Sequence, residues 1–223
     1  AKYAIVYLTI WTPFLAISET AMSDRVAALD FGAMTEVVQF LMELDKLKGV
    51  ERRTRLLDNA RQENSAEHSW HLAMAVMSMA PFSPDPIDVQ HAIKLALVHD
   101  VVEIDAGDVM VYDTAAREAI QVQEIAAARR IFGLLPGAQG EYFRALWDEY
   151  EAGDTAEARF ANMLDRALPV MLNLHNQGQS WKDNGIRLVQ VKARNVELAQ
   201  QWPALWQHLE QHLDCAHAKG WLL

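Results

Sequence analysis

The sequence is poor in cysteine, glycine and proline. Cys215 is the single cysteine among 223 residues, so this chain forms no internal disulfide and no cysteine-based zinc site. So few thiols fit a reducing compartment, and we expect a cytoplasmic protein. Only 10 glycines and 7 prolines interrupt the chain, and alanine, leucine, glutamate and glutamine are common, which favours helix.

Two further absences restrict the partners. The chain has no long basic run and a formal net charge of −10, which argues against a nucleic-acid backbone as the main partner. A small phosphorylated substrate stays possible because it needs only a few local cations. The uncharged stretch 3–18 is shorter than the roughly 20 residues of a membrane-spanning helix. We therefore expect no membrane partner.

Residues 1–21 differ from the rest of the chain. They are apolar, with Lys2 near the front and Pro13 in the middle. Our preferred interpretation is an extension ahead of the natural start, with Met22 opening the functional protein. A signal-like segment is one alternative, and an ordered segment that covers apolar surface or pairs with another subunit is a second. Because 51% of the chain is hydrophobic, we expect residues 22–223 to form one domain around one core.

Apolar residues at helical spacing predict roughly seven helices. They cover 34–48, 65–79, a segment from Asp88 into His99–Asp100, 114–132, 139–151, 156–175 and 183–214. Asn64 or Ser65 would cap the second helix, and Pro169 and Pro203 predict a kink or break. Residues 51–65 read as a long connecting loop with four arginines, and we see no strand pattern and no repeat. The predicted fold class is an all-α helical bundle.

Four ionisable residues stand out by their apolar surroundings: His68, His99, Asp100 and Asp165. A charge inside an apolar helical run is unfavourable unless it is compensated, and one divalent metal would compensate all four together. Their spacing alone is a weak signal. His68 bonded to a backbone carbonyl, a buried His99–Asp100 pair and a surface ion pair between Asp165 and Arg166 are the alternatives.

These residues resemble the H…HD…D signature of the HD-domain metal-dependent phosphohydrolases. The stretches 61–69 and 99–108 are similar to those of a subgroup that contains bacterial 5′-deoxynucleotidases and the eukaryotic HD-domain-containing protein 2. The resemblance covers roughly residues 35–180, and several separate motifs occur in the right order. It implies an HD-domain bundle, and because members of the subgroup are usually dimers, we expect a homodimer.

The resemblance also implies a role for each matching residue. One divalent metal ion would be held by His68, His99, Asp100 and Asp165. Glu103 and Asp108 match acidic residues beside the metal-bound water, and Arg53 matches an arginine that contacts the substrate phosphate. The subgroup often has an aromatic residue after that arginine, whereas this chain has Thr54, which puts discrimination between ribose and deoxyribose in doubt.

Chemistry agrees with these roles. Mixed imidazole and carboxylate ligands suit Mn, Co, Fe or Zn. Glu103 lies three and four residues after Asp100 and His99, so it can share their helix face and orient the attacking water. Arg61 is a second candidate for the phosphate because arginine binds phosphate bidentately. It could instead brace its loop.

The expected activity is release of phosphate from nucleoside 5′-monophosphates, with deoxynucleotides as an open subclass. A phosphodiesterase or a pyrophosphohydrolase acting on a signalling nucleotide is the first alternative, although such substrates would need more cationic contacts than the loop arginines clearly offer. The second alternative is a non-catalytic, metal-stabilised binding protein, which would keep the metal ligands without needing Glu103.

Overall fold

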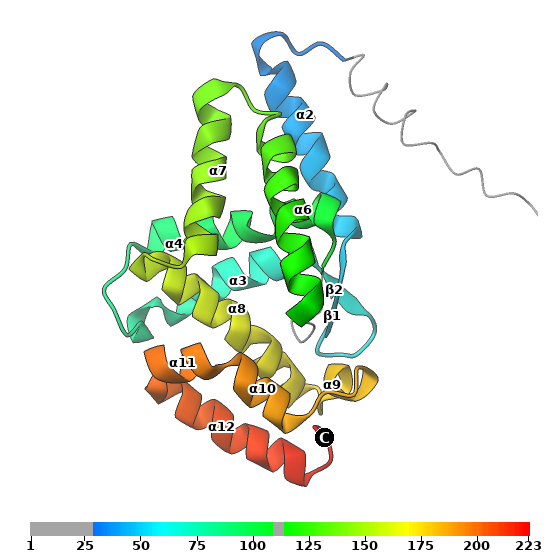
Figure 1. Ribbon diagram of the computed structural model, residues 1–223, viewed down its shortest axis with the longest axis vertical. Coiled ribbons are helices and arrows are strands. Elements are labelled where there is room, and N and C mark those ends of the chain that lie inside the picture. Colours follow the sequence, from blue (N-terminus) through cyan, green and yellow to red (C-terminus); the bar gives the residue numbers. More distant parts are fainter. Residues whose placement is uncertain (1–28, 109–113) are drawn as a thin grey trace, which may run out of the picture.

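The computed structural model describes residues 29–108 and 114–223, with the backbone alone for 114–119. Helices dominate this part of the chain, and the only sheet within it is a small two-stranded hairpin (Figure 1). The predicted all-α class is therefore confirmed. The predicted extension 1–21 lies outside the described residues. None of the described helices is long and apolar enough to span a bilayer.

The described residues form a series of helices that one hairpin interrupts. They are η1 (Gly32–Met34), α2 (Thr35–Leu44), η2 (Asp45–Gly49), β1 (Glu51–Arg55), β2 (Gln62–Asn64), α3 (Ser65–Met79), η3 (Ala80–Phe82), α4 (Val89–Val98), η4 (His99–Val102), α5 (Glu103–Ala106), α6 (Thr114–Phe132), α7 (Gly137–Ala152), α8 (Ala156–His175), α9 (Gln179–Asp183), α10 (Leu188–Arg194), α11 (Val196–Gln201) and α12 (Pro203–Ala218).

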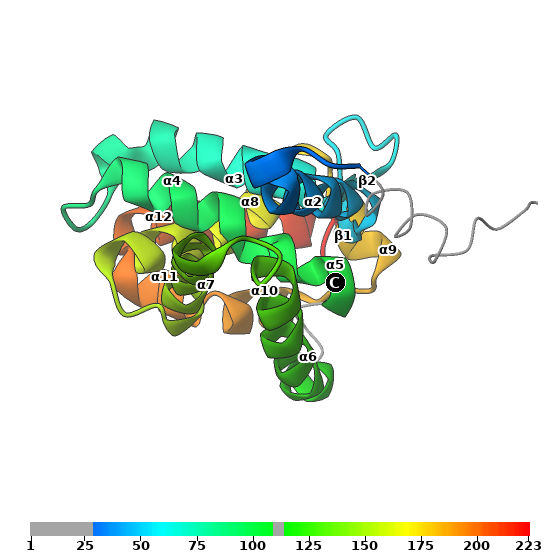
Figure 2. The ribbon, with the colours of Figure 1, turned by 90° about the horizontal axis from the view of Figure 1, so that it is seen from above.

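Three helices form the centre of the molecule. α3 packs along α4, and α8 contacts both, so their fully buried side chains Leu72, Leu95 and Leu164 belong to one core. Figure 1 shows α2 and α7 above this centre, α6 running from the upper part down past α3, and α10, α11 and α12 below the centre. Seen from above, α3 and α4 run side by side along one face, and α6 projects from the other (Figure 2).

Local signals position the helices that carry the candidate ligands. The Asn64 side chain accepts a hydrogen bond from the Glu67 backbone N–H at 2.9 Å, and the Glu67 carboxylate accepts one from the Asn64 N–H at 3.1 Å. This capping box fixes the start of α3 one turn before His68. Asp88 caps α4, and Thr155 caps α8.

The prediction of a connecting loop over 51–65 is wrong, because these residues contain the antiparallel hairpin β1–β2. Its inward positions are the charged residues Arg52 and Glu63, whose side chains are 12% and 4% exposed. A strand with a charged inner face shows no alternation of hydrophobicity, and that alternation is the signal on which strand prediction depends. The hairpin therefore looked like a polar loop.

The prediction of one long helix over 183–214 is also wrong, because the three helices α10, α11 and α12 take its place. Pro203 starts α12 at a position where its missing N–H costs nothing, so the break expected there is confirmed. A second break falls at Asn195, between α10 and α11, and α10 begins only at Leu188. The bundle consequently has more helices than the roughly seven predicted. α8 continues past Pro169 to His175.

Replacing Asn64 by alanine tests the capping box. The variant loses the side-chain acceptor at the start of α3, so we expect the free energy of unfolding to fall by about 1 kcal/mol. Denaturant titration measures the change. Asn64→Asp is the control because it keeps an acceptor, and an equal loss in both variants would contradict the cap.

Candidate active site

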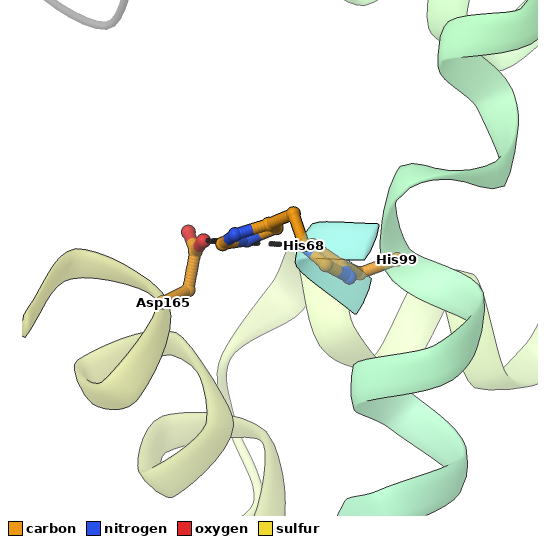
Figure 3. Close-up of side chains that lie close together, drawn as sticks. All are labelled: His68, His99 and Asp165. Carbon is orange, nitrogen blue, oxygen red and sulfur yellow. Dashed lines mark hydrogen bonds and ion pairs between the residues drawn. The ribbon is translucent and has the colours of Figure 1, made fainter. Parts of the chain in front are cut away.

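Side chains from three distant segments converge on one point (Figure 3). His68 comes from the first turn of α3, His99 from the start of η4 and Asp165 from the middle of α8. Asp165 Oδ1 lies 2.8 Å from His68 Nε2 and 3.9 Å from His99 Nε2. Each residue thus offers one ligand atom, and these atoms lie within 4.8 Å of one another.

Asp100 completes the predicted ligand set. Its Oδ1 lies 2.9 Å from His99 Nε2, and its Oδ2 accepts a hydrogen bond from Arg52 Nη1 at 3.0 Å. Neighbouring residues on a helix point in different directions, so a common ion must lie above the edge between them. The short distance places Asp100 beside His99. Three of the four predicted ligands, His68, His99 and Asp165, bring their ligand atoms together, and the role of Asp100 as a ligand stays a prediction.

The donor set fits a cation. His99 Nδ1 lies 2.9 Å from the Ala96 carbonyl oxygen, so we assign the ring proton to Nδ1, and Nε2 then carries a lone pair. Nε2 is buried and, within the described parts of the chain, forms no hydrogen bond. It faces carboxylate oxygens of Asp100 and Asp165. Acceptors facing acceptors require a positive charge between them, and imidazole plus carboxylate suits a divalent metal.

Without a metal, protons supply part of that charge. Burial alone would lower the pKa of His99, but the Asp100 carboxylate raises it to about 9. Burial alone would raise the pKa of Asp165, yet the hydrogen bond with His68 and the nearby positive charges hold it below its usual range. Both shifts have one cause, which is that this position favours positive charge.

Two predicted catalytic acids lie beside the cluster. Glu103 Oε2 accepts a hydrogen bond from Ser65 Oγ at 2.5 Å. Burial, followed by the charge of Asp100, raises the pKa of Glu103 well above its ordinary value. Burial likewise raises the pKa of Asp108, although Arg52 opposes the shift. Carboxyl groups with raised pKa values can hold and transfer protons near neutral pH.

Sequence reasoning missed Arg52 and Glu63. Arg52 reaches Asp100, and its Nε lies 3.3 Å from Glu63 Oε1. Glu63 Oε1 also lies 3.6 Å from His68 Nδ1. Burial would lower the pKa of Arg52, but the charges of Asp100 and the other acids raise it further above its ordinary value. Recognising residues 51–55 as a strand would have revealed Arg52, because it occupies the inward side.

The two arginines predicted to bind phosphate have different surroundings. Arg53 is exposed and lines the pocket beside Asp165 and Asp108. In the described parts of the chain, no hydrogen bond or ion pair of the Arg53 side chain is found. Arg61 donates two hydrogen bonds to the Glu67 carboxylate and one to the Gln62 carbonyl, and it does not line this pocket. Its phosphate role stays a prediction, while its contacts brace the hairpin.

The pocket extends from Asp165, a member of the His68–His99–Asp165 cluster, to an apolar wall. Its volume is about 100 Å³, several times the roughly 10–15 Å³ that one water requires. Its wall includes Pro169, Val170, Trp181 and Ile186, which come from α8, α9 and the turn after α9. The geometry combines a cation site, unpaired positive charge, two proton carriers and an apolar surface. This combination suits hydrolysis of a phosphate ester that carries a ring-containing leaving group.

Comparison with known proteins identifies the family of this chain. The HD domain family profile matches residues 44–206, so the chain belongs to the HD domain family, as the motifs predicted. The human protein named 5′-deoxynucleotidase HDDC2 is 34% identical over 131 residues, which cover 58% of this chain and 63% of the human protein. Its Bos taurus counterpart is 31% identical over 147 residues, with 66% and 70% covered.

A solved structure is similar over most of the chain. The predicted metal-dependent phosphohydrolase from Magnetospirillum magnetotacticum is 37% identical, with a TM-score of 0.79, and the match covers 85% of this chain and 97% of that one. A Listeria innocua HD-domain phosphohydrolase has a TM-score of 0.55 at 17% identity, with 82% and 86% covered, and shows a shared fold alone.

Leucine substitutions distinguish the two neighbouring arginines. Arg52→Leu leaves the carboxylates of Asp100 and Glu63 buried without their cation, so we expect the metal-free protein to lose about 3–5 kcal/mol of unfolding free energy. Arg53→Leu changes an exposed side chain, and its effect should stay within about 0.5 kcal/mol. Urea titration in the presence of a chelator measures both. Equal losses would show that Arg52 has no special place in the acidic cluster.

Proposed function

We propose that this chain is a metal-dependent phosphohydrolase that releases inorganic phosphate from nucleoside 5′-monophosphates. The observation that carries the proposal is the cluster of His68, His99 and Asp165, with Asp100 beside His99; Asp165 also lines the pocket that Arg53 lines. The curated relatives are named 5′-deoxynucleotidases, and that name supports the same class of substrate.

The ligand residues define the kind of metal chemistry. A divalent ion bound there would lower the pKa of a bound water and neutralise charge on the phosphoryl group. We propose one ion, chosen among Mn, Co, Fe and Zn, because the site offers nitrogen and oxygen atoms without a thiolate. His99 is preorganised for this role by its Ala96 contact, and Asp100 by its hydrogen bond from Arg52.

The side chains around the ligands supply the remaining steps. Arg53 binds the phosphate and holds the phosphorus in line with the attacking water. In its ionised form, Glu103 would accept a proton from that water as its oxygen bonds to phosphorus; because its pKa is raised, this form is populated at higher pH than for an ordinary glutamate. The bond between phosphorus and the 5′ oxygen breaks, and Asp108 gives a proton to the leaving oxygen, so that nucleoside and phosphate are released. The raised pKa of Asp108 keeps that proton available at higher pH than for an ordinary aspartate.

The charges at the pocket support a monoester over a pyrophosphate. A pyrophosphate carries more negative charge and would need additional cations at the site, whereas the pocket arginine Arg166 is paired with Glu197 at 2.6 Å. Arg61 is likewise occupied by Glu67. Arg53 remains as the exposed cation suited to a single phosphate.

Three further proposals accompany the activity. We propose a homodimer, on the basis of the subgroup that the motifs resemble, and a cytoplasmic location, on the basis of the single cysteine. We also propose that residues 22–223 form one domain preceded by an extension. Light scattering of the purified protein measures its molar mass in solution and so tests the homodimer.

Metal dependence is the first test of the activity. Protein stripped of metal should release no phosphate from ribo- and deoxynucleoside monophosphates, and addition of Mn, Co, Fe or Zn should restore release, because the ligand atoms act through the ion. Mg is a useful comparison because it prefers all-oxygen ligands. The ribose-to-deoxyribose ratio reports the consequence of Thr54. Stoichiometric metal binding without release from any nucleotide would overturn the proposal.

Glu103→Gln tests whether the protein is an enzyme or a metal-stabilised binding protein. The variant keeps the side-chain shape but cannot accept the proton, so phosphate release should slow by about 100-fold or more. Metal content, measured by mass spectrometry, should be unchanged. Asp105→Asn is the matched control, because Asp105 lies on the same short helix and pairs with Arg130 away from the pocket. Full activity in Glu103→Gln would favour another proton carrier.

A further inference from the structure

One polar atom on the pocket wall has no partner. Asn195 lines the pocket and is 2% exposed, and its Oδ1 forms no hydrogen bond with any part of the chain that the structure describes. Its Nδ2 donates to the Val191 carbonyl oxygen at 2.9 Å. That bond fixes the orientation of the amide and leaves Oδ1 as its unpaired acceptor.

The backbone gives Asn195 this position. It stands at the break between α10 and α11, where it ends one helix and begins the next. An unbroken helix over 183–214 would have continued through this point. The break places a buried amide at the wall of a cavity, where an unpaired carbonyl oxygen is costly unless a ligand or water bonds to it.

The amides and the hydroxyl that α8, α9 and the turn after α9 bring to this wall take part in hydrogen bonds. Asn173 donates to the Pro169 carbonyl oxygen and accepts from the Trp181 N–H. Ser180 Oγ accepts from the Arg55 N–H, and Asn184 donates to the Ser180 carbonyl oxygen. Asn195 Oδ1 is therefore the buried side-chain acceptor of this wall that has no partner among the described residues.

The wall is continuous with the metal end of the pocket. Arg166 directly follows the ligand Asp165, and its Nη1 donates to the carbonyl oxygen of Arg194, which directly precedes Asn195. One arginine side chain therefore connects the metal cluster to the position of Asn195. Trp181 and Ile186 provide apolar surface in the same pocket.

From these observations we infer that Asn195 reads the nucleobase: its Oδ1 accepts a hydrogen bond from a ring N–H or an exocyclic amino group. The inference rests on the proposed function and adds a specificity-determining residue to it. With the phosphate at Arg53 and the metal ligands, the base lies against the apolar wall between α8 and α10. A substrate with no base gains nothing from this contact.

The test compares two phosphate esters on the same protein. Wild-type, Asn195→Leu and Asn195→Ala proteins, each loaded with the metal that supports release, are assayed with dAMP and with 2-deoxyribose 5-phosphate, which lacks the base. Removing the acceptor leaves a base N–H unpaired in the complex, so the dAMP-to-sugar-phosphate ratio of kcat/KM should fall by about tenfold or more. The ratio is independent of the folded fraction, so partial unfolding does not mimic the effect.

Asn176→Leu is the matched control. Asn176 is 4% exposed, also has one unpartnered amide atom among the described residues, and does not line the pocket, so its ratio should equal that of the wild type. A ratio that is unchanged in both Asn195 variants overturns the inference while the phosphatase activity stands. An equal fall in Asn176→Leu overturns it as well. Absence of phosphate release from both substrates in the wild type removes the proposed function and this inference together.

Discussion

The compensation of buried negative charge governs the centre of this protein. Five carboxylates act on Arg52: Glu63 from the hairpin, Asp100, Glu103 and Asp108 from residues 99–108, and Asp165 from α8. Such a group is unfavourable unless positive charge is bound within it. Arg52 supplies one permanent charge from the hairpin, and His68 and His99 supply nitrogen atoms that bind either protons or a metal. The arrangement of α3, η4, α8 and the hairpin follows from the need to bring these groups together.

The sequence predicted what depends on apolar periodicity and on local motifs. The helices that carry His68, His99 and Asp165 could be read from their spacing and caps, and the HD motif predicted the ligands that the structure brings together. It did not predict the hairpin, because charged residues occupy the inward strand positions. It also did not predict the role of Arg52, since Arg52 and Arg53 are adjacent arginines whose environments differ only once the strand is known.

The C-terminal region illustrates a second limit of sequence reasoning. Pro203 predicts a helix break because its ring removes the backbone N–H. Asn195, by contrast, resembles any polar residue within an amphipathic helix. The break at Asn195 depends on packing against α8 and α12, which no local pattern records. This region lies largely outside the recognised motifs, so the part of the pocket that we propose to contact the nucleoside can differ between relatives that share the motif residues.

The contacts of Arg55 connect the hairpin to α9. Its backbone N–H donates to Ser180 Oγ at 2.9 Å, and its guanidinium pairs with Asp183 at 2.6 Å. The strand that supplies Arg52 and Arg53 is thereby attached to the helix that supplies Trp181. Elements joined in this way open and close as one cooperative unit. Occupation of the metal site would then slow amide hydrogen exchange in α9 as well as in the hairpin, although no residue of α9 is a candidate ligand.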